Sequence, residues 1–293
     1  MDGILNVYKE QGFTSFDVVA KLRGVYHQKK IGHTGTLDPD AEGVLPVCLG
    51  KATRVCDLLT DKDKEYTAVL RLGIMTDTQD MTGCVLAEHP VDVTEEQVRD
   101  AIRSFIGTYD QVPPMYSALK VNGQKLCDLA RKGITVERAA RTIQIYDIEI
   151  LSMQLPEVTI RVSCSKGTYI RTLCQDIGDR LGCFGCMKSL LRTKAAGFVL
   201  ADAHRISEIE QNPDEWIMPV DTVFVHLPKA DLSADAGKLL ANGNKIPEEV
   251  ISNLSESLKS SESVRMYNEE GQFAGLYTYR EEERCFKPLK MFL

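Results

Sequence analysis

Residues 32–43 read Gly32-His33-Thr34-Gly35-Thr36-Leu37-Asp38-Pro39-Asp40-Ala41-Glu42-Gly43. Three glycines and a proline within these twelve residues exclude a helix or strand interior, because each interrupts regular backbone hydrogen bonding or order. Apolar residues flank the stretch, with Ile31 before it and Val44-Leu45-Pro46-Val47 after it. These residues predict a constrained loop between two buried segments, and taken alone they fit a plain turn as well as a functional site.

Two common ligand-binding loops do not fit this stretch. The spacing of Asp38, Asp40 and Glu42 imitates the start of an EF-hand calcium loop, but Leu49 stands at the twelfth position, where a glutamate must bind the ion. A phosphate-binding loop is excluded because no Gly-Lys-Ser/Thr follows and the chain has no Gly-x-Gly-x-x-Gly. Neither calcium nor a nucleotide phosphate is predicted to bind here.

Four further motifs follow in order along the chain. They are Lys64-Glu65-Tyr66, Gly73-Ile74-Met75-Thr76-Asp77-Thr78-Gln79-Asp80, Pro113-Pro114-Met115-Tyr116-Ser117-Ala118-Leu119-Lys120 and Ser163-Cys164-Ser165-Lys166-Gly167-Thr168-Tyr169-Ile170-Arg171. In residue type, order and spacing, the series resembles the bacterial TruB-type tRNA pseudouridine synthases, which isomerise uridine 55 in the T loop of tRNA. The resemblance covers residues 3–200 closely and the segment after Lys229 only loosely.

The resemblance implies an α+β fold in two domains. Residues 1–229 would form a pseudouridine synthase catalytic domain with a mixed, largely antiparallel sheet, and residues 230–293 a small PUA-like RNA-binding β-barrel. Local patterns agree, since strands and helices are mixed along the chain without a regular βα repeat. The predicted strands are Ile4–Tyr8, Tyr66–Leu72, Ile143–Ile150 and Val158–Cys164; the predicted helices are Thr14–Leu22, Thr94–Ile106 (with a Thr94/Gln97 capping box), Lys125–Lys132 and Thr168–Leu181.

Composition indicates an ordinary globular protein, with 43% apolar and 26% charged residues. No apolar run is long enough for a membrane helix, and the N-terminus lacks the basic and apolar regions of a signal peptide, so we expect a cytoplasmic protein. Nine scattered cysteines suit reduced thiols rather than a disulfide framework. Cys183 and Cys186 have ligand spacing, but no second pair or nearby histidine completes a zinc site, so we expect them to be structural.

Charge does not decide whether the partner is a nucleic acid. The net charge is −7, yet residues 160–200 hold seven basic and only two acidic side chains. Residues 231–293 hold eight basic and eleven acidic side chains. A basic working face on an acidic protein fits RNA binding, but solvated surface lysines and arginines would give the same counts.

The implied reaction breaks the bond between uracil N1 and the sugar, turns the base over and joins C5 to C1′, without redox or group transfer. No cofactor and no metal is therefore expected. The resemblance implies Asp38 as the catalytic aspartate, Arg171 as the arginine that keeps it ionised and directs it, and Tyr66 as the ring that stacks on the base. The Tyr66 hydroxyl would be placed to remove the C5 proton. Whether Asp38 adds to the base, bonds to the sugar or removes the 2′ proton stays open.

Five more residues are implied to bind the substrate or line its pocket. His33 matches the histidine that fills the space left by flipped nucleotides, and Lys9 and Lys64 match positions near the active site and RNA backbone. Tyr169 is implied to wall the pocket and orient the catalytic arginine, and Leu190 matches an apolar pocket residue. Taken singly, each would be read as a turn, core or surface residue.

The sequence departs from the family pattern at a few positions. Asp40 and Glu42 stand where apolar or small residues are usual, and we expect both to point to solvent. Glu10 replaces a usual proline and Cys127 a usual tyrosine, which affects loop rigidity and packing rather than the reaction.

The expected partner is the T-arm of tRNA, bound by a monomer without an obligatory protein partner. An RNA-binding module without catalysis is disfavoured, because Asp38, Tyr66 and Arg171 are all present. A related synthase working within a guide-RNA complex is disfavoured by the short segment before Ile4 and the lack of long basic tails.

Overall fold

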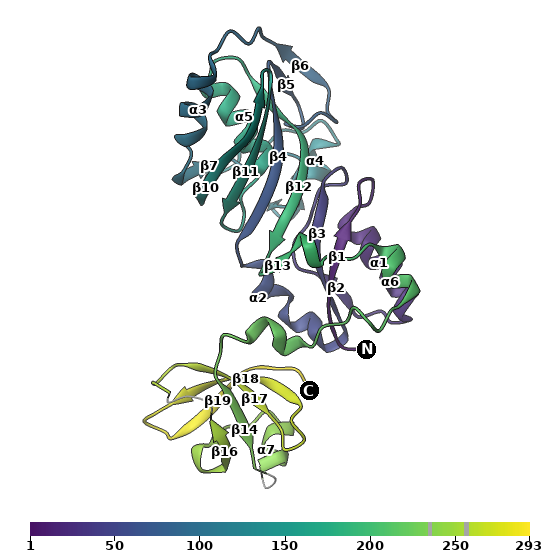
Figure 1. Ribbon diagram of the computed structural model, residues 1–293, viewed down its shortest axis with the longest axis vertical. Helices are drawn as coiled ribbons and strands as arrows, with labels where there is room; N and C mark the ends of the chain where they lie inside the picture. Colours follow the sequence, from purple (N-terminus) through teal and green to yellow (C-terminus); the bar gives the residue numbers. More distant parts are fainter. Residues whose placement is uncertain (234–235, 255–257) are drawn as a thin grey trace.

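The computed structural model describes residues 1–233, 236–254 and 258–293. Two sheets organise the chain, one of nine strands and one of six. Figure 1 shows the six-stranded sheet as a separate body below the larger one. Together with few helices, these sheets confirm the predicted α+β class.

The nine-stranded sheet has the order β1-β3-β12-β4-β11-β10-β7, with β2 beside β3 and β13 beside β12. Its ladders are antiparallel except for the β12–β3 pair, which confirms a mixed, largely antiparallel sheet. The strands are β1 Gly3–Lys9, β2 Ile31–His33, β3 Glu42–Leu49, β4 Lys64–Leu72, β7 Gly107–Gln111, β10 Arg141–Gln154, β11 Glu157–Cys164, β12 Gly185–Ala195 and β13 Phe198–Val199.

Helices cover this sheet, with α5 packed against β4 and β12 and α6 against β1. None of the helices in the described ranges is both long and apolar enough to cross a membrane. The helices are α1 Ser15–Tyr26, α2 Cys56–Thr60, α3 Glu95–Arg103, α4 Leu126–Ala130, α5 Ile170–Arg180 and α6 Ile206–Gln211, with 3-10 turns η1 Gly50–Val55, η2 Leu200–Asp202 and η3 Val220–Phe224. Two small hairpins pair β5 Ile74–Thr76 with β6 Val85–Glu88, and β8 Lys120–Val121 with β9 Gln124–Lys125.

The parallel contact between β12 and β3 divides the large sheet into two halves, and we call it the seam. It consists of two residue pairs, Leu191 with Glu42 and Arg192 with Gly43. One apolar core lies around β1, β3 and α1, and another around β4, β11 and α5. A Cβ atom at Gly43 would lie 2.3 Å from the Arg192 carbonyl oxygen, so the two backbones approach closely only because this residue is glycine.

The sequence located most elements, with some errors at helix ends. Thr94 caps α3 and Gln97 completes the predicted capping box. That helix ends at Arg103 rather than Ile106, and the residues after it form tighter turns. The helix predicted from Thr168 begins at Ile170, because Tyr169 is extended.

The six-stranded sheet has the order β15-β19-β18-β17-β14-β16 and curls into a nearly closed barrel with its own apolar core. The small β-barrel predicted for this region is confirmed, and the exact domain division after residue 229 stays a prediction. The elements are β14 Lys229–Leu232, α7 Gly237–Ala241, β15 Ile246–Pro247, η5 Glu248–Val250, β16 Ile251–Leu254, β17 Ser263–Tyr267, β18 Phe273–Arg280 and β19 Cys285–Met291.

A fourth apolar cluster joins the barrel to the larger body. It combines Ile4 and Val55 from the first part of the chain with Leu276 and Phe292 from the barrel. Polar contacts surround it, including a bond of 2.6 Å from Arg54 to the Met291 carbonyl oxygen. Removing the barrel would therefore uncover part of the core of the larger body.

Phe292→Ala should lower the free energy of unfolding of the full chain by about 3–5 kcal/mol, because it empties part of this shared cluster. Phe292 is 5% exposed, whereas nearby Leu289 is 60% exposed and serves as the control. We expect Leu289→Ala to change stability by less than about 0.5 kcal/mol in the same urea titration. Equal effects of the two substitutions would show that the cluster does not join the two bodies.

Candidate active site

Residues 34–41 form the loop between β2 and β3, and they reach from one core to the other. Ile31 at the start belongs to the core around β1 and β3, whereas Leu37 is buried in the core around β4 and β11. Ser15 in α1 fixes the middle of the loop, since its Oγ accepts from the Leu37 backbone N at 2.9 Å. Asp38 directly follows Leu37, so the bond to Ser15 and the burial of Leu37 fix its position.

Asp38 and Arg171 form a two-point ion pair, as the sequence analysis expected of these residues. Arg171 Nε lies 3.0 Å from Asp38 Oδ2, and Nη2 donates to Oδ1 at 3.2 Å. The Arg171 side chain is only 6% exposed, whereas that of Asp38 is 37% exposed. The guanidinium thus holds a carboxylate that remains open to a substrate on its other side.

Burial raises the pKa of Asp38 above its ordinary value, and the Arg171 guanidinium opposes this shift without cancelling it. Asp80 adds to the rise, because a second negative charge disfavours ionisation. A carboxylate with a raised pKa is a stronger base and nucleophile when it is ionised.

Arg171 has further partners that the sequence analysis did not assign. It donates to the carbonyl oxygens of Thr78 at 3.1 Å and Tyr116 at 2.7 Å, and its Nη1 lies 3.6 Å from Asp80 Oδ2. Asp80 in turn accepts bonds from the hydroxyls of Thr78 at 2.7 Å and Thr82 at 2.6 Å. Asp80 ends one of the quoted motifs, so a signal was present, but only the fold shows what it contacts.

Lys9 is buried beside the loop of residues 34–41 that carries Asp38. Its side chain is buried, and its ammonium donates to the carbonyl oxygens of Glu10 at 3.1 Å, Pro39 at 3.0 Å and Ala41 at 2.5 Å. Burial lowers the pKa of Lys9 to about 8. With its three donors occupied, Lys9 supports the loop from within, and its place near the RNA backbone stays a prediction.

Lys9→Met should destabilise the fold by at least about 2 kcal/mol, because it leaves buried carbonyl oxygens without donors. Turnover should fall more than tRNA affinity, since the loop that carries Asp38 loses its support. Exposed Lys30, changed to Met, is the matched control. Urea unfolding and single-turnover assays would measure both effects, and a Lys9→Met variant as stable as the control would refute the supporting role.

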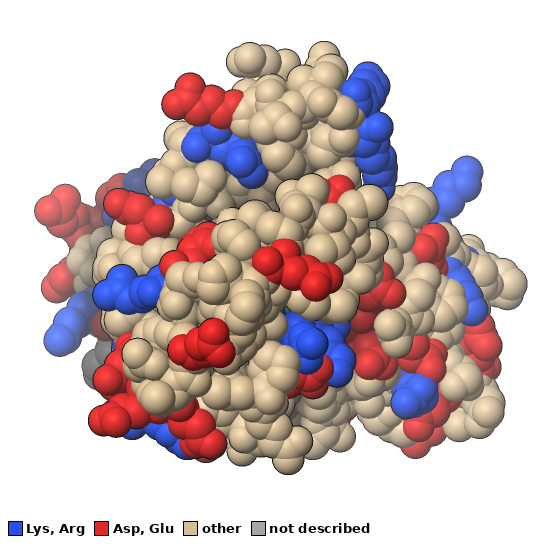
Figure 2. Space-filling view, turned by 90° about the horizontal axis from the view of Figure 1, so that it is seen from above, with Lys and Arg blue, Asp and Glu red and all other residues tan. Residues whose placement is uncertain are grey.

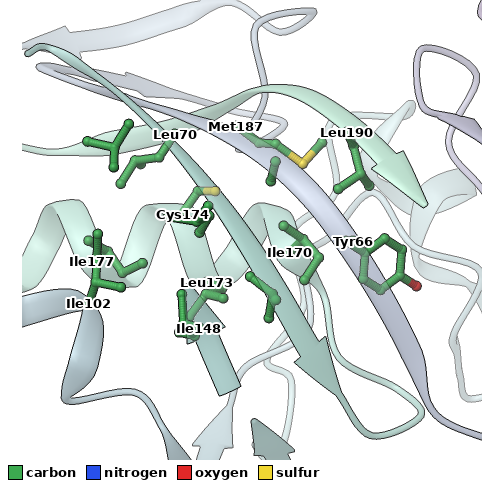
Figure 3. Close-up of a cluster of buried hydrophobic side chains, with 14 of the residues drawn as sticks. Tyr66, Leu70, Ile102, Ile148, Ile170, Leu173, Cys174, Ile177, Met187 and Leu190 are labelled. Atoms are coloured by element: carbon green, nitrogen blue, oxygen red, sulfur yellow. The ribbon is translucent and has the colours of Figure 1, made fainter. Parts of the chain in front are cut away.

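Tyr66 and Leu190 lie on neighbouring strands, β4 and β12, and each is 9% exposed. Figure 3 shows Tyr66 at the end of a row of apolar side chains, with its hydroxyl oxygen directed away from them. Burial raises the pKa of Tyr66, and the charge of the neighbouring Arg192 guanidinium opposes the rise. The Tyr66 ring thus lies in the apolar core, and its hydroxyl lies at the edge of that core.

Tyr169 precedes α5 and is fixed by a residue that the sequence analysis did not single out. The Gln111 side chain accepts from the Tyr169 backbone N at 2.8 Å and donates to its carbonyl oxygen at 3.0 Å. These two hydrogen bonds hold the Tyr169 backbone in an extended conformation, so the helix begins only at Ile170. It also fixes the backbone next to Arg171.

His33 is half-buried, and Lys64 is buried. The Gly35 backbone N donates to His33 Nδ1 at 3.3 Å, and burial together with the charge of Arg192 lowers the pKa of His33, which favours a neutral ring. Lys64 Nζ donates to the carbonyl oxygens of Thr60 and Lys62, each at 2.5 Å. These bonds leave Lys64 one N–H for a further partner.

The two extra acids of the loop differ from each other. Asp40 is exposed, as expected. Glu42 is half-buried and accepts a bond of 3.0 Å from the Tyr8 hydroxyl, so the expectation that it points to solvent is wrong. The side chain is turned inward by this tyrosine on the adjacent strand β1.

Figure 2 shows basic and acidic side chains interspersed over one face of the molecule. Among the residues with described positions, no three His, Cys, Asp or Glu side chains are arranged to hold a metal ion. Cys183 and Cys186 are buried thiols. The site combines an accessible carboxylate beside a buried guanidinium with a phenol at the edge of an apolar cluster.

Comparison with known proteins identifies the class and then the family. The profile of the TruB family pseudouridylate synthase N-terminal domain matches residues 23–170, and that of the tRNA pseudouridylate synthase B C-terminal domain matches residues 171–225. Pseudouridine synthases are isomerases, and this chain belongs to their TruB family.

Relatives of similar length support this membership. The tRNA pseudouridine synthase B of Lachnoclostridium phytofermentans is 54% identical over 308 residues, covering 100% of both chains. That of Alkaliphilus oremlandii is 45% identical and covers 99% of this chain and 97% of its own. A chain in the structure of an H/ACA RNP bound to a substrate RNA containing 2′-deoxyuridine superposes with a TM-score of 0.73 at 26% identity, covering 99% of this chain and 85% of its own.

Proposed function

We propose that this protein converts uridine 55 in the T loop of tRNA to pseudouridine. One observation carries the proposal. The Asp38 carboxylate is paired at two points with the buried Arg171 guanidinium, and the Asp38 side chain is still 37% exposed. Relatives named tRNA pseudouridine synthase B support tRNA as the substrate.

In this proposal Asp38 attacks the nucleoside or removes a proton from it, and Arg171 keeps the carboxylate oriented through two donors. Tyr66 stacks on the base and accepts the C5 proton in the last step. The three residues come from the loop of residues 34–41, α5 and β4. The ion pair of Asp38 with Arg171 and the electrostatic influence of Asp38 on Tyr66 support their acting together.

The remaining predicted residues would surround the flipped nucleotide. Leu190 and Tyr169 would form the apolar wall, and His33, held neutral by burial, would fill the space that the base leaves. Flipping a stacked base costs roughly a few kcal/mol, which contacts to the RNA must supply. Lys64, with its one free N–H, is the proposed phosphate contact, whereas Lys9 acts through the loop.

No cofactor is needed in this proposal, because the product is an isomer of the substrate. One chain supplies Asp38, Tyr66 and Arg171, so a monomer suffices. Such an enzyme would act in the cytoplasm, where bacterial tRNA is processed.

We also propose residues 230–293 as an RNA-binding domain. Support comes from its barrel with a core of its own and from its place beside the larger body. Ultraviolet crosslinking of bound tRNA followed by peptide mapping would test this. Crosslinks confined to residues before Lys229 would remove the barrel from RNA recognition.

The decisive experiment mixes the dialysed protein, in buffer with EDTA, with an unmodified tRNA transcript and then maps pseudouridine. We expect conversion at position 55 and none in a transcript carrying cytidine there. Conversion only after a guide RNA is added would favour the guide-dependent class, to which the H/ACA likeness points. Binding without conversion under both conditions would leave an RNA-binding protein.

A further inference from the structure

Arg192 in β12 is a buried cation for which the reaction described above has no role. Its side chain is 1% exposed. Nε donates to the Val44 carbonyl oxygen at 2.7 Å, and Nη2 donates to that of Gly35 at 3.2 Å. Among the ion pairs of the described residues, none includes this arginine. A buried charge without a counter-ion is costly, so its position calls for a reason.

Among the described residues, the acidic group that acts on the Arg192 guanidinium is the nearby Tyr66 hydroxyl. The two residues are register partners in the β4–β12 ladder, so their side chains leave the sheet side by side. The other groups acting on Tyr66, the Cys164 thiol and the Asp38 carboxyl, both disfavour a negative charge on its oxygen, as burial does. Arg192 therefore supplies the positive charge at this oxygen.

Arg192 also connects Tyr66 to the catalytic loop. Its backbone pairs with Gly43 across the seam, and its guanidinium bonds carbonyl oxygens at Gly35 and Val44, on either side of Asp38. One side chain thus touches the base-stacking ring and both flanks of the loop.

We propose that Arg192 is a positioning residue for the reaction, holding the Tyr66 hydroxyl toward C5 of the turned base and stabilising negative charge on its oxygen. This inference rests on the proposed function. Tyr66 first loses its phenolic proton to water, and the Arg192 charge stabilises the phenolate. Once C5 is bonded to C1′, the phenolate oxygen accepts the C5 proton, and the electron pair of that C–H bond forms the C5=C6 double bond. The pair displaced from the C6=N1 bond takes a proton at N1, so the product is an isomer.

The test uses tRNA transcripts made with uridine or 5-deuteriouridine in single-turnover reactions. Arg192→Gln keeps donors for the carbonyl oxygens and removes the charge. We expect its rate to fall by about 10²-fold and a primary deuterium effect to appear that wild type lacks, because C5 proton removal becomes limiting. Arg192→Lys keeps a positive charge, and we expect it to react at least about tenfold faster than Arg192→Gln. In the Tyr66→Phe background, Arg192→Gln should lower the single-turnover rate by less than about threefold.

Several outcomes would overturn the inference. They are a wild-type rate for Arg192→Gln, an equal loss in both Tyr66 backgrounds, or a loss without a deuterium effect. If Arg192→Gln does not fold, Arg192→Lys decides, and a folded Lys variant as slow as Tyr66→Phe would refute the role of the charge. In each case wild type still makes pseudouridine. Failure of wild type itself would instead refute the proposed function.

Discussion

Asp38→Asn should reduce pseudouridine formation below detection while tRNA affinity changes by no more than about tenfold, roughly 1.4 kcal/mol. The substitution keeps size and most hydrogen-bonding capacity, but it removes the charge that Arg171 grips and the nucleophilic oxygen pair. Binding should survive because RNA contacts are spread over other groups. Pseudouridine mapping at enzyme excess and filter binding would measure the two effects separately.

Asp40→Asn is the matched control, since Asp40 lies two residues away in the same loop and is exposed. It should turn over at nearly the wild-type rate. Readily measured turnover by Asp38→Asn would refute the catalytic assignment. Thermal unfolding of both variants identifies misfolding, which would show as a lowered midpoint in Asp38→Asn alone.

Tyr66→Phe should slow turnover by about 10²–10⁴-fold with little change in tRNA binding. The phenyl ring preserves stacking and apolar packing, and only the hydroxyl beside Arg192 is lost. Single-turnover rates at saturating tRNA would isolate the chemical step from binding.

Tyr8→Phe is the control for this substitution, because the Tyr8 hydroxyl bonds Glu42 near the same loop but faces no proposed reacting atom. We expect it to remain within a few fold of wild type. If Tyr66→Phe were as active as Tyr8→Phe, the role of Tyr66 would be limited to stacking.

Local signals predicted much of the fold. Alternation at Tyr66–Leu72 and the capping box at Thr94 identified β4 and α3, because burial periodicity and end-capping act within a few residues. The end of α3 and the start of α5 were missed, since tighter turns and the distant Gln111 set those boundaries. Order along the chain implied the pairing of Asp38 with Arg171.

What the sequence could not show is which distant groups enclose the site. Asp80 and Gln111 reach Arg171 and Tyr169 from other parts of the chain. Arg192 looks like an ordinary basic residue in a strand until β12 is placed between β3 and β4. The burial of Lys9 could not be predicted for the same reason, because burial is a property of the assembled sheet.

The seam has a consequence for how this enzyme tolerates mutation. Asp38 precedes β3 and Tyr66 lies in β4, so the separation of the two groups depends on the two residue pairs between β3 and β12. Each half of the sheet packs on its own core, and the loop of residues 34–41 links the two cores. A side chain added at Gly43 would push the halves apart without emptying either core. Such a variant would lose activity as the two groups separate, and it would also lose stability, because the φ of +105° at Gly43 strains any residue with a side chain.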